Sequence, residues 1–97
     1  MIKPHIITIM FKAAPGKEKA LKDFLDSITD VVAQSPGCIK HDLHQCVDDP
    51  STFMLYENWT NKAAHADHVA RPEVQAWIAE APSFLEKPCE IKCWSMW

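Results

Sequence analysis

This chain contains only two glycines, and each of them follows a proline, in Pro15-Gly16 and Pro36-Gly37. Pro-Gly pairs mark turns, so the two pairs bound a separate segment of the sequence. Within that segment the apolar residues recur at helical spacing, with charged residues mostly on the opposite face. The apolar stripe consists of Leu21, Phe24, Leu25, Ile28, Val31 and Val32. We therefore predict an amphipathic helix that starts at Lys17 and ends before the second pair.

Four further segments have the composition of strands, being rich in β-branched, aromatic and other apolar residues. They cover residues 5–12, 38–47, 52–59 and 89–97. The second and third strands are separated by a turn rich in Asp and Pro, which predicts an antiparallel hairpin.

A second, broken helix is predicted between the third and fourth strands. Thr60 is the expected N-cap of a helix over residues 61–70, and Pro72 starts a new helical segment after a break. The resulting order is the βαββαβ of a ferredoxin-like α+β fold, with a four-stranded antiparallel sheet and both helices on one face. A chain of 97 residues allows a single domain, residues 1–97.

The strands carry apolar residues on both of their faces. In the first strand, Ile7, Ile9 and Phe11 alternate with Ile6 and Met10. An antiparallel sheet with one solvated face should alternate more cleanly between apolar and polar residues. Helices cover only one face, so we expect a second copy of the chain to cover the other and predict a homodimer.

Composition excludes several classes of function. The formal net charge is −3, so no basic surface is expected for nucleic acid or for a membrane surface. No run of 18 apolar residues and no signal-peptide pattern is present, and we expect a cytoplasmic protein with reduced cysteines. With only two glycines the chain has no glycine-rich phosphate loop, and a large bound cofactor is not indicated.

The predicted strand over residues 52–59 carries a carboxylate, Glu57, two residues before Trp59. Side chains two apart on a strand share a face of the sheet. The following helix supplies His68, and a carboxylate close to an imidazole can prepare it for proton transfer. Trp59 would then give an aromatic substrate a flat apolar wall. In the structural alternative, which residue types alone favour, Glu57 pairs with a lysine or caps the helix and His68 is partly exposed.

The other histidines bear on metal binding. His41 and His44 are three apart on a strand and point to opposite sides, so they cannot share one ion. His65 and His68 share a helix face, but no third ligand and no HExxH motif accompanies them. We therefore expect no metal site. Trp77 is expected in the core or in a pocket that the broken helix leaves above the sheet.

The chain contains a set of short fragments whose order and spacing are specific when they are taken together. They are Ala14-Pro15-Gly16-Lys17, Ser35-Pro36-Gly37-Cys38, Asp42-Leu43-His44, Asp49-Pro50, Phe53-Met54-Leu55-Tyr56-Glu57-Asn58-Trp59, His68 and Arg71-Pro72-Glu73-Val74. Through them the chain resembles the antibiotic biosynthesis monooxygenase family over nearly its full length. The resemblance implies a protomer that pairs into a dimeric α+β barrel. It also implies a cofactor-independent monooxygenase that oxidises a quinol or polycyclic phenolic substrate with dioxygen.

Glu57, Trp59 and His68 match positions typical of the family. In our leading hypothesis, His68 is the catalytic base, Glu57 its orienting partner and Trp59 the wall of the substrate site. Five further side chains are expected to contact the small aromatic or quinone-like substrate: His44, Tyr56, His65, Arg71 and Trp77.

Two other functions stay open at this point. The first is isomerisation of a small phosphorylated ketone, with Arg71, Lys62 and Lys40 as the cations for its phosphate. The second is a non-catalytic barrel that binds a small ligand, because one fold hosts many functions. Haem degradation is disfavoured, because the positions at which that branch of the family carries a histidine and an asparagine correspond to Ile78 and Ile9 here.

Overall fold

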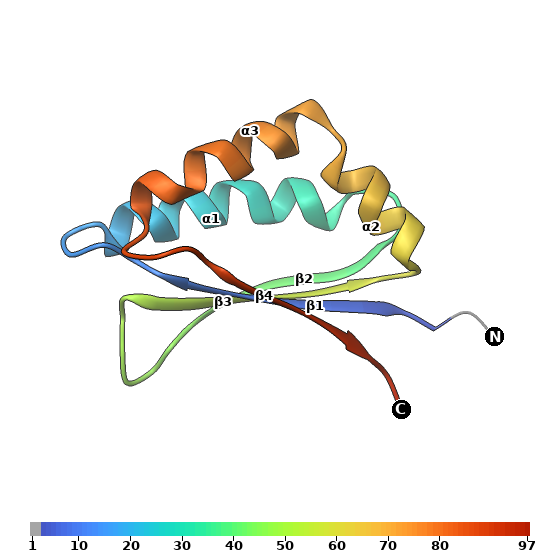
Figure 1. The fold of residues 1–97 in the computed structure, drawn as a ribbon, viewed down its shortest axis with the longest axis horizontal. Coiled ribbons are helices and arrows are strands. Elements are labelled where there is room, and N and C mark those ends of the chain that lie inside the picture. The colour runs from blue at the N-terminus through green and yellow to red at the C-terminus, as the bar shows by residue number, and fades with distance from the viewer. Residues whose placement is uncertain (1–2) are drawn as a thin grey trace.

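Residues 3–97, which the computed structural model describes, form a four-stranded antiparallel sheet with the helices packed on one of its faces (Figure 1). The elements are β1 (His5–Lys12), α1 (Glu18–Ala33), β2 (Cys38–Gln45), β3 (Thr52–Trp59), α2 (Lys62–Val69), α3 (Pro72–Glu80), the 3₁₀ helix η1 (Ala81–Phe84) and β4 (Glu90–Ser95). The strand order is β2-β3-β1-β4, so β3 and β1 are central. The predicted ferredoxin-like βαββαβ fold is confirmed.

Element ends differ from the sequence prediction where side chains bond to the backbone. Asn61, and not Thr60, caps α2, because its side chain accepts a hydrogen bond of 2.8 Å from the Ala64 amide. In the hairpin turn, the carboxylate of Asp49 accepts hydrogen bonds from Lys12 Nζ and from the Ser51 amide. This closed turn ends β2 at Gln45, before the predicted end at residue 47.

The turn before β2 fixes how closely α2 approaches the sheet. Gly37 has a φ of +82°, in the left-handed region that favours glycine. A Cβ atom added at Gly37 would lie 2.5 Å from Cβ of Ala64 on α2. The Gly37 carbonyl also accepts a hydrogen bond of 2.8 Å from the Thr60 amide. The second Pro-Gly pair therefore does more than end α1, because it lets α2 pack directly against the start of β2.

The core lies between the sheet and the helices and has two parts. The larger, beneath the first half of α1, contains the buried residues Phe11, Ala13, Leu21, Leu25, Phe53 and Leu55. The smaller, near the other end of α1, contains Ile7, Val32 and Trp59. Most of the predicted α1 stripe packs inward, but Val31 is 52% exposed and its inclusion in the stripe was wrong. The four cysteines are free thiols.

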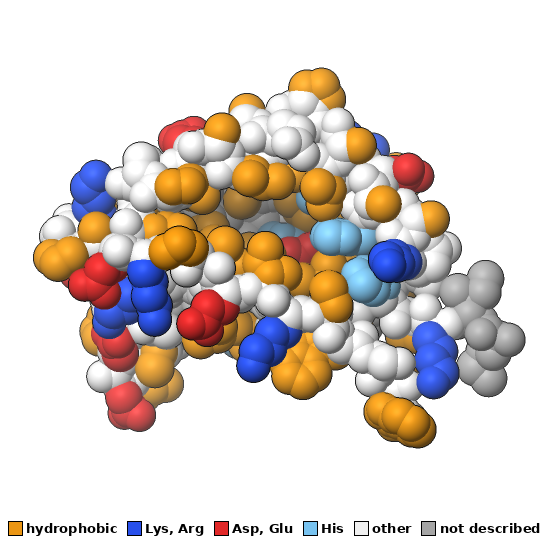
Figure 2. Space-filling model, in the orientation of Figure 1, with side chains coloured by type: hydrophobic (Ala, Val, Ile, Leu, Met, Phe, Trp, Pro, Cys, Tyr) orange, Lys and Arg blue, Asp and Glu red, His pale blue; other side chains and the backbone are white. Residues whose placement is uncertain are grey.

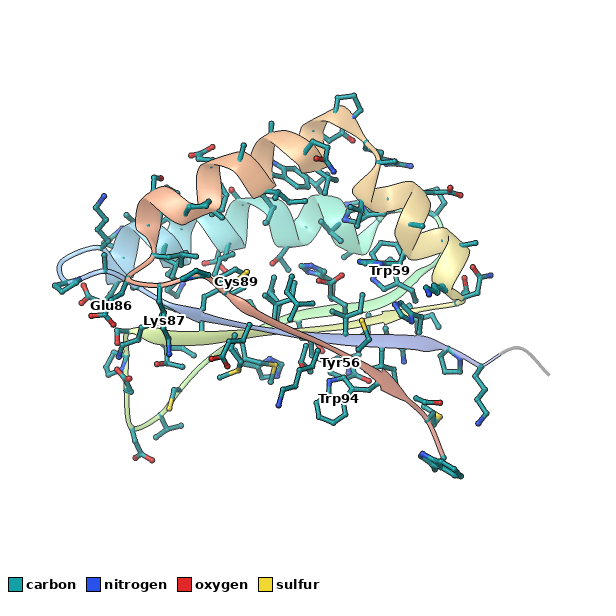
Figure 3. The ribbon with its side chains drawn as sticks, in the orientation of Figure 1. Tyr56, Trp59, Glu86, Lys87, Cys89 and Trp94 are labelled. Carbon is teal, nitrogen blue, oxygen red and sulfur yellow. The ribbon has the colours of Figure 1, made fainter. Side chains whose placement is uncertain are left out.

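The opposite face of the sheet carries large apolar side chains without covering helices. We call this surface the open face and define it by Ile6, Met10, Met54, Tyr56 and Trp94, which share one parity in the paired strands. Figure 3 shows Tyr56 and Trp94 on that side of the sheet and Trp59 on the helix side. Met10 is 40% and Trp94 50% exposed, and every residue of the edge strand β4 is exposed. None of the helices in residues 3–97 has the length and apolar character needed to cross a membrane.

Candidate active site

A cavity of about 490 Å³ lies between the sheet and the helices, and Figure 2 shows it as a hollow beneath them. The apolar stripe of α3 faces it with Val74, Trp77 and Ile78, followed by Ala81 at the start of η1. Apart from three imidazoles, a carboxyl group and a thiol, the wall is apolar; these groups belong to His41, His65, His68, Glu57 and Cys89. Within residues 3–97, neither Lys nor Arg lines the cavity. The titratable side chains therefore face an otherwise apolar space.

Glu57 reaches this cavity because β3 alternates strictly between buried and half-buried residues. Its side chain is on the helix side, as is that of Trp59, so the predicted shared face is confirmed. Trp59 Nε1 donates a hydrogen bond of 2.9 Å to Glu57 Oε1. Burial raises the pKa of Glu57, while this indole donor opposes the shift. Glu57 neither pairs with a lysine nor caps α2, as the structural alternative required.

His68 is the only buried residue of α2 and is 8% exposed. Its ring lies 4.8 Å from the Trp59 ring, centroid to centroid, and its Nδ1 is buried with no hydrogen-bond partner. Burial and the nearby Arg71 guanidinium lower the pKa of His68. The imidazole is therefore neutral at neutral pH, with a lone pair free to accept a proton.

His41 is a site residue that the sequence reasoning missed. It pairs with Glu57 across the β2–β3 ladder, and its Nε2 lies 3.9 Å from Glu57 Oε2. The side chain is buried, and its Nδ1 has no partner. Burial, reinforced by His68, lowers the pKa of His41 to about 4. The sequence held only part of the signal. The predicted strand ends, residues 47 and 52, bring residue 41 opposite residue 58, whereas the observed register, one residue different, pairs it with Glu57.

Trp59 has a different place from the one expected. It has no exposed surface and does not line the cavity, so it is not a wall against which substrate lies. It instead packs against two imidazoles of α2, since the His65 ring lies 5.5 Å and the His68 ring 4.8 Å from its own ring. Figure 3 shows Trp59 between the sheet and α2. Alternation along β3 predicted the face of Trp59 but not its depth.

The remaining predicted site residues divide into two groups. His65 and Trp77 line the cavity with Glu57 and His68. Burial and the neighbouring His5, whose ring centroid lies 5.5 Å away, lower the pKa of His65 to about 4. His44, Tyr56 and Arg71 do not line this cavity.

The separation of the second group follows from the backbone. His44 pairs with Met54, and Tyr56 alternates with Glu57, so both lie on the open face. Arg71 lines a second, smaller cleft on the outer side of α2. The structure therefore places Glu57 and His68 in one cavity, but Glu57 is bonded to Trp59 and faces His41 rather than His68. The second group lies outside that cavity.

The described residues also bear on metal and haem binding. Across residues 3–97, no group of three or more His, Cys, Asp or Glu side chains is arranged to hold a metal ion. Ile9 and Ile78, at the positions that would distinguish a haem-degrading relative, both line the cavity as apolar side chains.

Comparison with known proteins adds an independent line of argument. The model of the family described as "Antibiotic biosynthesis monooxygenase" matches residues 4–80, which run from β1 to the end of α3 and contain His41, Glu57, Trp59 and His68. The uncharacterized protein sll1783 of Synechocystis is 25% identical over 93 residues, 96% of this chain and 63% of that protein. The chain thus spans less than two thirds of the length of that relative.

Two further relatives are similar to this chain over nearly their whole length. The Bacillus subtilis protein named "Putative monooxygenase YcnE" is 22% identical over 86 residues, 89% of this chain and 90% of that one. The crystal structure of PA3566 from Pseudomonas aeruginosa superposes with a TM-score of 0.91 and 25% identity, covering 100% of this chain and 97% of that one. Since the family model covers most of the sequence, including His41, Glu57 and His68 of the candidate site, this chain belongs to the antibiotic biosynthesis monooxygenase family.

Proposed function

We propose that this chain is a cofactor-independent monooxygenase that oxidises a quinol or a polycyclic phenol with dioxygen. The observation that carries the proposal is that two neutral imidazoles, His68 and His41, share an otherwise apolar cavity with the carboxyl group of Glu57. Such a cavity favours a substrate with a flat apolar body and one acidic hydroxyl or methylene group.

The chemistry requires a base, orientation and exclusion of water. His68 accepts a proton from the bound substrate, and the resulting anion passes an electron to dioxygen. With an anthrone, the carbon–oxygen bond then forms at the reactive methylene, and a proton is returned to the peroxide. The peroxide loses water, so one oxygen atom stays as a new carbonyl and the other leaves with the two methylene hydrogens. The substrate supplies all the electrons for this reaction.

Glu57 and His41 are proposed to orient the substrate and to adjust the charge beside it. Glu57 is held by the Trp59 indole through the 2.9 Å hydrogen bond, so its second oxygen faces His41. Burial favours the uncharged forms of both Glu57 and His41. Burial therefore acts to weaken the repulsion between Glu57 and an anion formed in the cavity.

The test of the proposal is oxygen uptake with reduced menadione and with an anthrone, measured against the rate without protein. We expect uptake to saturate with substrate and to proceed after exhaustive chelation of metals. Binding of both compounds without any increase in oxygen uptake would contradict the proposal and favour the non-catalytic binding barrel.

The cavity gives less support to an isomerase of a phosphorylated ketone. That reaction needs a cation for the phosphate in the same space as the base. Of the three cations considered for this role, none lines the cavity, and Arg71 faces the separate cleft outside α2. The empty space beside Glu57 and His68 also differs from the filled core expected of a purely structural barrel.

A homodimer is the second part of the proposal, and it rests on the open face. Trp94 and Met10, which are 50% and 40% exposed, form with the other residues of the open face an apolar surface of the kind that marks protein contacts. We expect the wild-type protein to elute as a dimer at both low and high salt, and Trp94→Lys to shift it to the monomer. Light scattering coupled to size-exclusion chromatography measures both masses.

The matched control for this prediction is Val31→Lys. Val31 is 52% exposed, close to the value for Trp94, but lies on α1 away from the open face. This variant should remain dimeric. A wild-type monomer at micromolar concentration would show that the open face does not pair with a second copy.

A further inference from the structure

His68 lies between two spaces of opposite character. One is the apolar cavity, and the other is a cleft of about 330 Å³ on the outer side of α2. The cleft is formed by the turn that precedes β2 and by α2 and its C-terminal end; its lining is Ser35, Pro36, Gly37, Ala64, Asp67, His68 and Arg71. Within residues 3–97, His68 is the one side chain that lines both spaces.

The cleft differs from the cavity in the groups it offers. Ser35, Asp67 and Arg71 provide a hydroxyl, a carboxylate and a guanidinium group, which is enough to hold water molecules. Nδ1 of His68 is buried with no protein partner, so an ordered water or a substrate group is needed to satisfy it. An imidazole can take a proton on one nitrogen and release a proton from the other.

We propose that His68 is a proton port, which exchanges protons with water in the outer cleft while the substrate closes the apolar cavity. This inference rests on the proposed function, since it assigns the route of the proton that His68 removes from the substrate. In each cycle, the ring gains the substrate proton and gives a proton to cleft water. It later takes a proton from cleft water and passes it to the peroxide. No electron is transferred in these steps.

The geometry of the turn before β2 supports this role. Gly37 allows α2 to pack so closely that a Cβ atom at position 37 would overlap Ala64. The cleft beside Gly37 nevertheless stays open to the buried ring of His68. Trp59, which is fully buried, closes the side of His68 toward the sheet. The competing route passes through half-buried His65, whose ring centroid lies 6.3 Å from that of His68.

The experiment measures internal return of the abstracted proton. An anthrone deuterated at its reactive methylene is incubated with the protein without oxygen. The rate of enolate formation is followed by absorbance, and the loss of deuterium to solvent by mass spectrometry. In the wild-type protein we expect washout to keep pace with enolate formation.

Two variants close the cleft without changing His68. Ser35→Leu fills it from the buried side, and Asp67→Leu covers it from the exposed side, where the fold tolerates substitution. In both, we expect enolate to form at the wild-type rate and washout to slow at least about tenfold, because the deuteron returns to the substrate. Asp30→Leu, an exposed Asp on α1, is the matched control and should behave as wild type.

The outcomes separate the port from the proposed function. No enolate and no washout in the wild-type protein would contradict the base chemistry itself. Enolate formation with unchanged washout in Asp67→Leu and Ser35→Leu would overturn the port and leave the proposed function standing. Slow washout in His65→Gln alone would assign the route to His65 and also overturn the proposal.

Discussion

Replacing His68 by glutamine is expected to lower kcat for oxygen uptake by a factor of about 10² to 10⁴, the usual contribution of a positioned general base. Glutamine has a similar size and keeps hydrogen-bonding capacity, but it cannot accept a proton. His68 is 8% exposed and packs on Trp59 at 4.8 Å, so its loss removes a base from an otherwise apolar cavity. Substrate binding should change much less than kcat, because the cavity wall is mainly apolar.

The control for this variant is His44→Gln. His44 is on β2, as His41 is, but it lies on the open face and does not line the cavity. The structure therefore predicts nearly wild-type kcat for this substitution, although the sequence had included His44 among the substrate contacts. Equal losses of kcat in the two variants would contradict the assignment of the base to the helix side of the sheet.

The pH dependence of the wild-type reaction has a definite direction. Burial and Arg71 lower the pKa of His68 below the ordinary value of 6.5, so its neutral, active form persists into mildly acidic solution. Oxygen uptake should be level through neutral pH and fall only as pH drops through this lowered pKa. In His68→Gln the residual rate should lose that acidic limb. A limb that persists in the variant would assign the titration to another group.

The fold was predictable because each element carries a local signal. Both central strands were predicted with their exact bounds, since β1 and β3 alternate or run apolar between clear turns. The ends of β2 and α2 were less accurate, because the side chains of Asp49 and Asn61 bond to nearby backbone and set those ends. Such bonds depend on the folded turn and not on the hydrophobic period.

The candidate site was predictable only as far as one strand and one helix define it. Alternation placed Glu57 beside Trp59, and the helix after β3 supplied His68 above them. His41 comes from a neighbouring strand, so its contact with Glu57 depends on hairpin register. Tyr56 illustrates the opposite error, because a residue adjacent to Glu57 in a strand must face the other side of the sheet.

Depth within the core is the quantity that the sequence did not supply. Ile7, Val32 and Trp59 have similar signals in their elements, yet only the packing shows that the indole is sealed behind two histidines. A tryptophan expected at the surface of a pocket is instead a support for the residues that line it. Mutation of Trp59 is therefore expected to lower the stability of the protein, whereas mutation of a pocket wall would have lowered its affinity for substrate.

Trp59→Ala is accordingly expected to destabilise the protein by about 3–5 kcal/mol, the usual cost of replacing a buried aromatic residue by alanine. The indole has no exposed surface, so the deletion leaves a cavity beneath His65 and His68. It also removes the hydrogen-bond donor of the buried Glu57 carboxyl group. The loss should lower Tm by at least about 12 °C for a domain of this size.

Thermal unfolding by circular dichroism, at one fixed protein concentration, measures this loss without interference from any concentration-dependent assembly. Trp97→Ala is the control, because Trp97 is fully exposed at the end of the chain. This variant should have a Tm within a degree or two of that of the wild-type protein.

Trp59→Phe separates packing from hydrogen bonding, since it keeps an aromatic ring but loses the indole N–H. Its Tm should lie between those of Trp59→Ala and wild type. The pKa of Glu57 should rise further in this variant, because the donor that now opposes the effect of burial is absent. A Tm for Trp59→Ala equal to that of the Trp97 control would refute the supporting role, and a pKa of Glu57 unchanged in Trp59→Phe would show that the indole does not hold the carboxyl group.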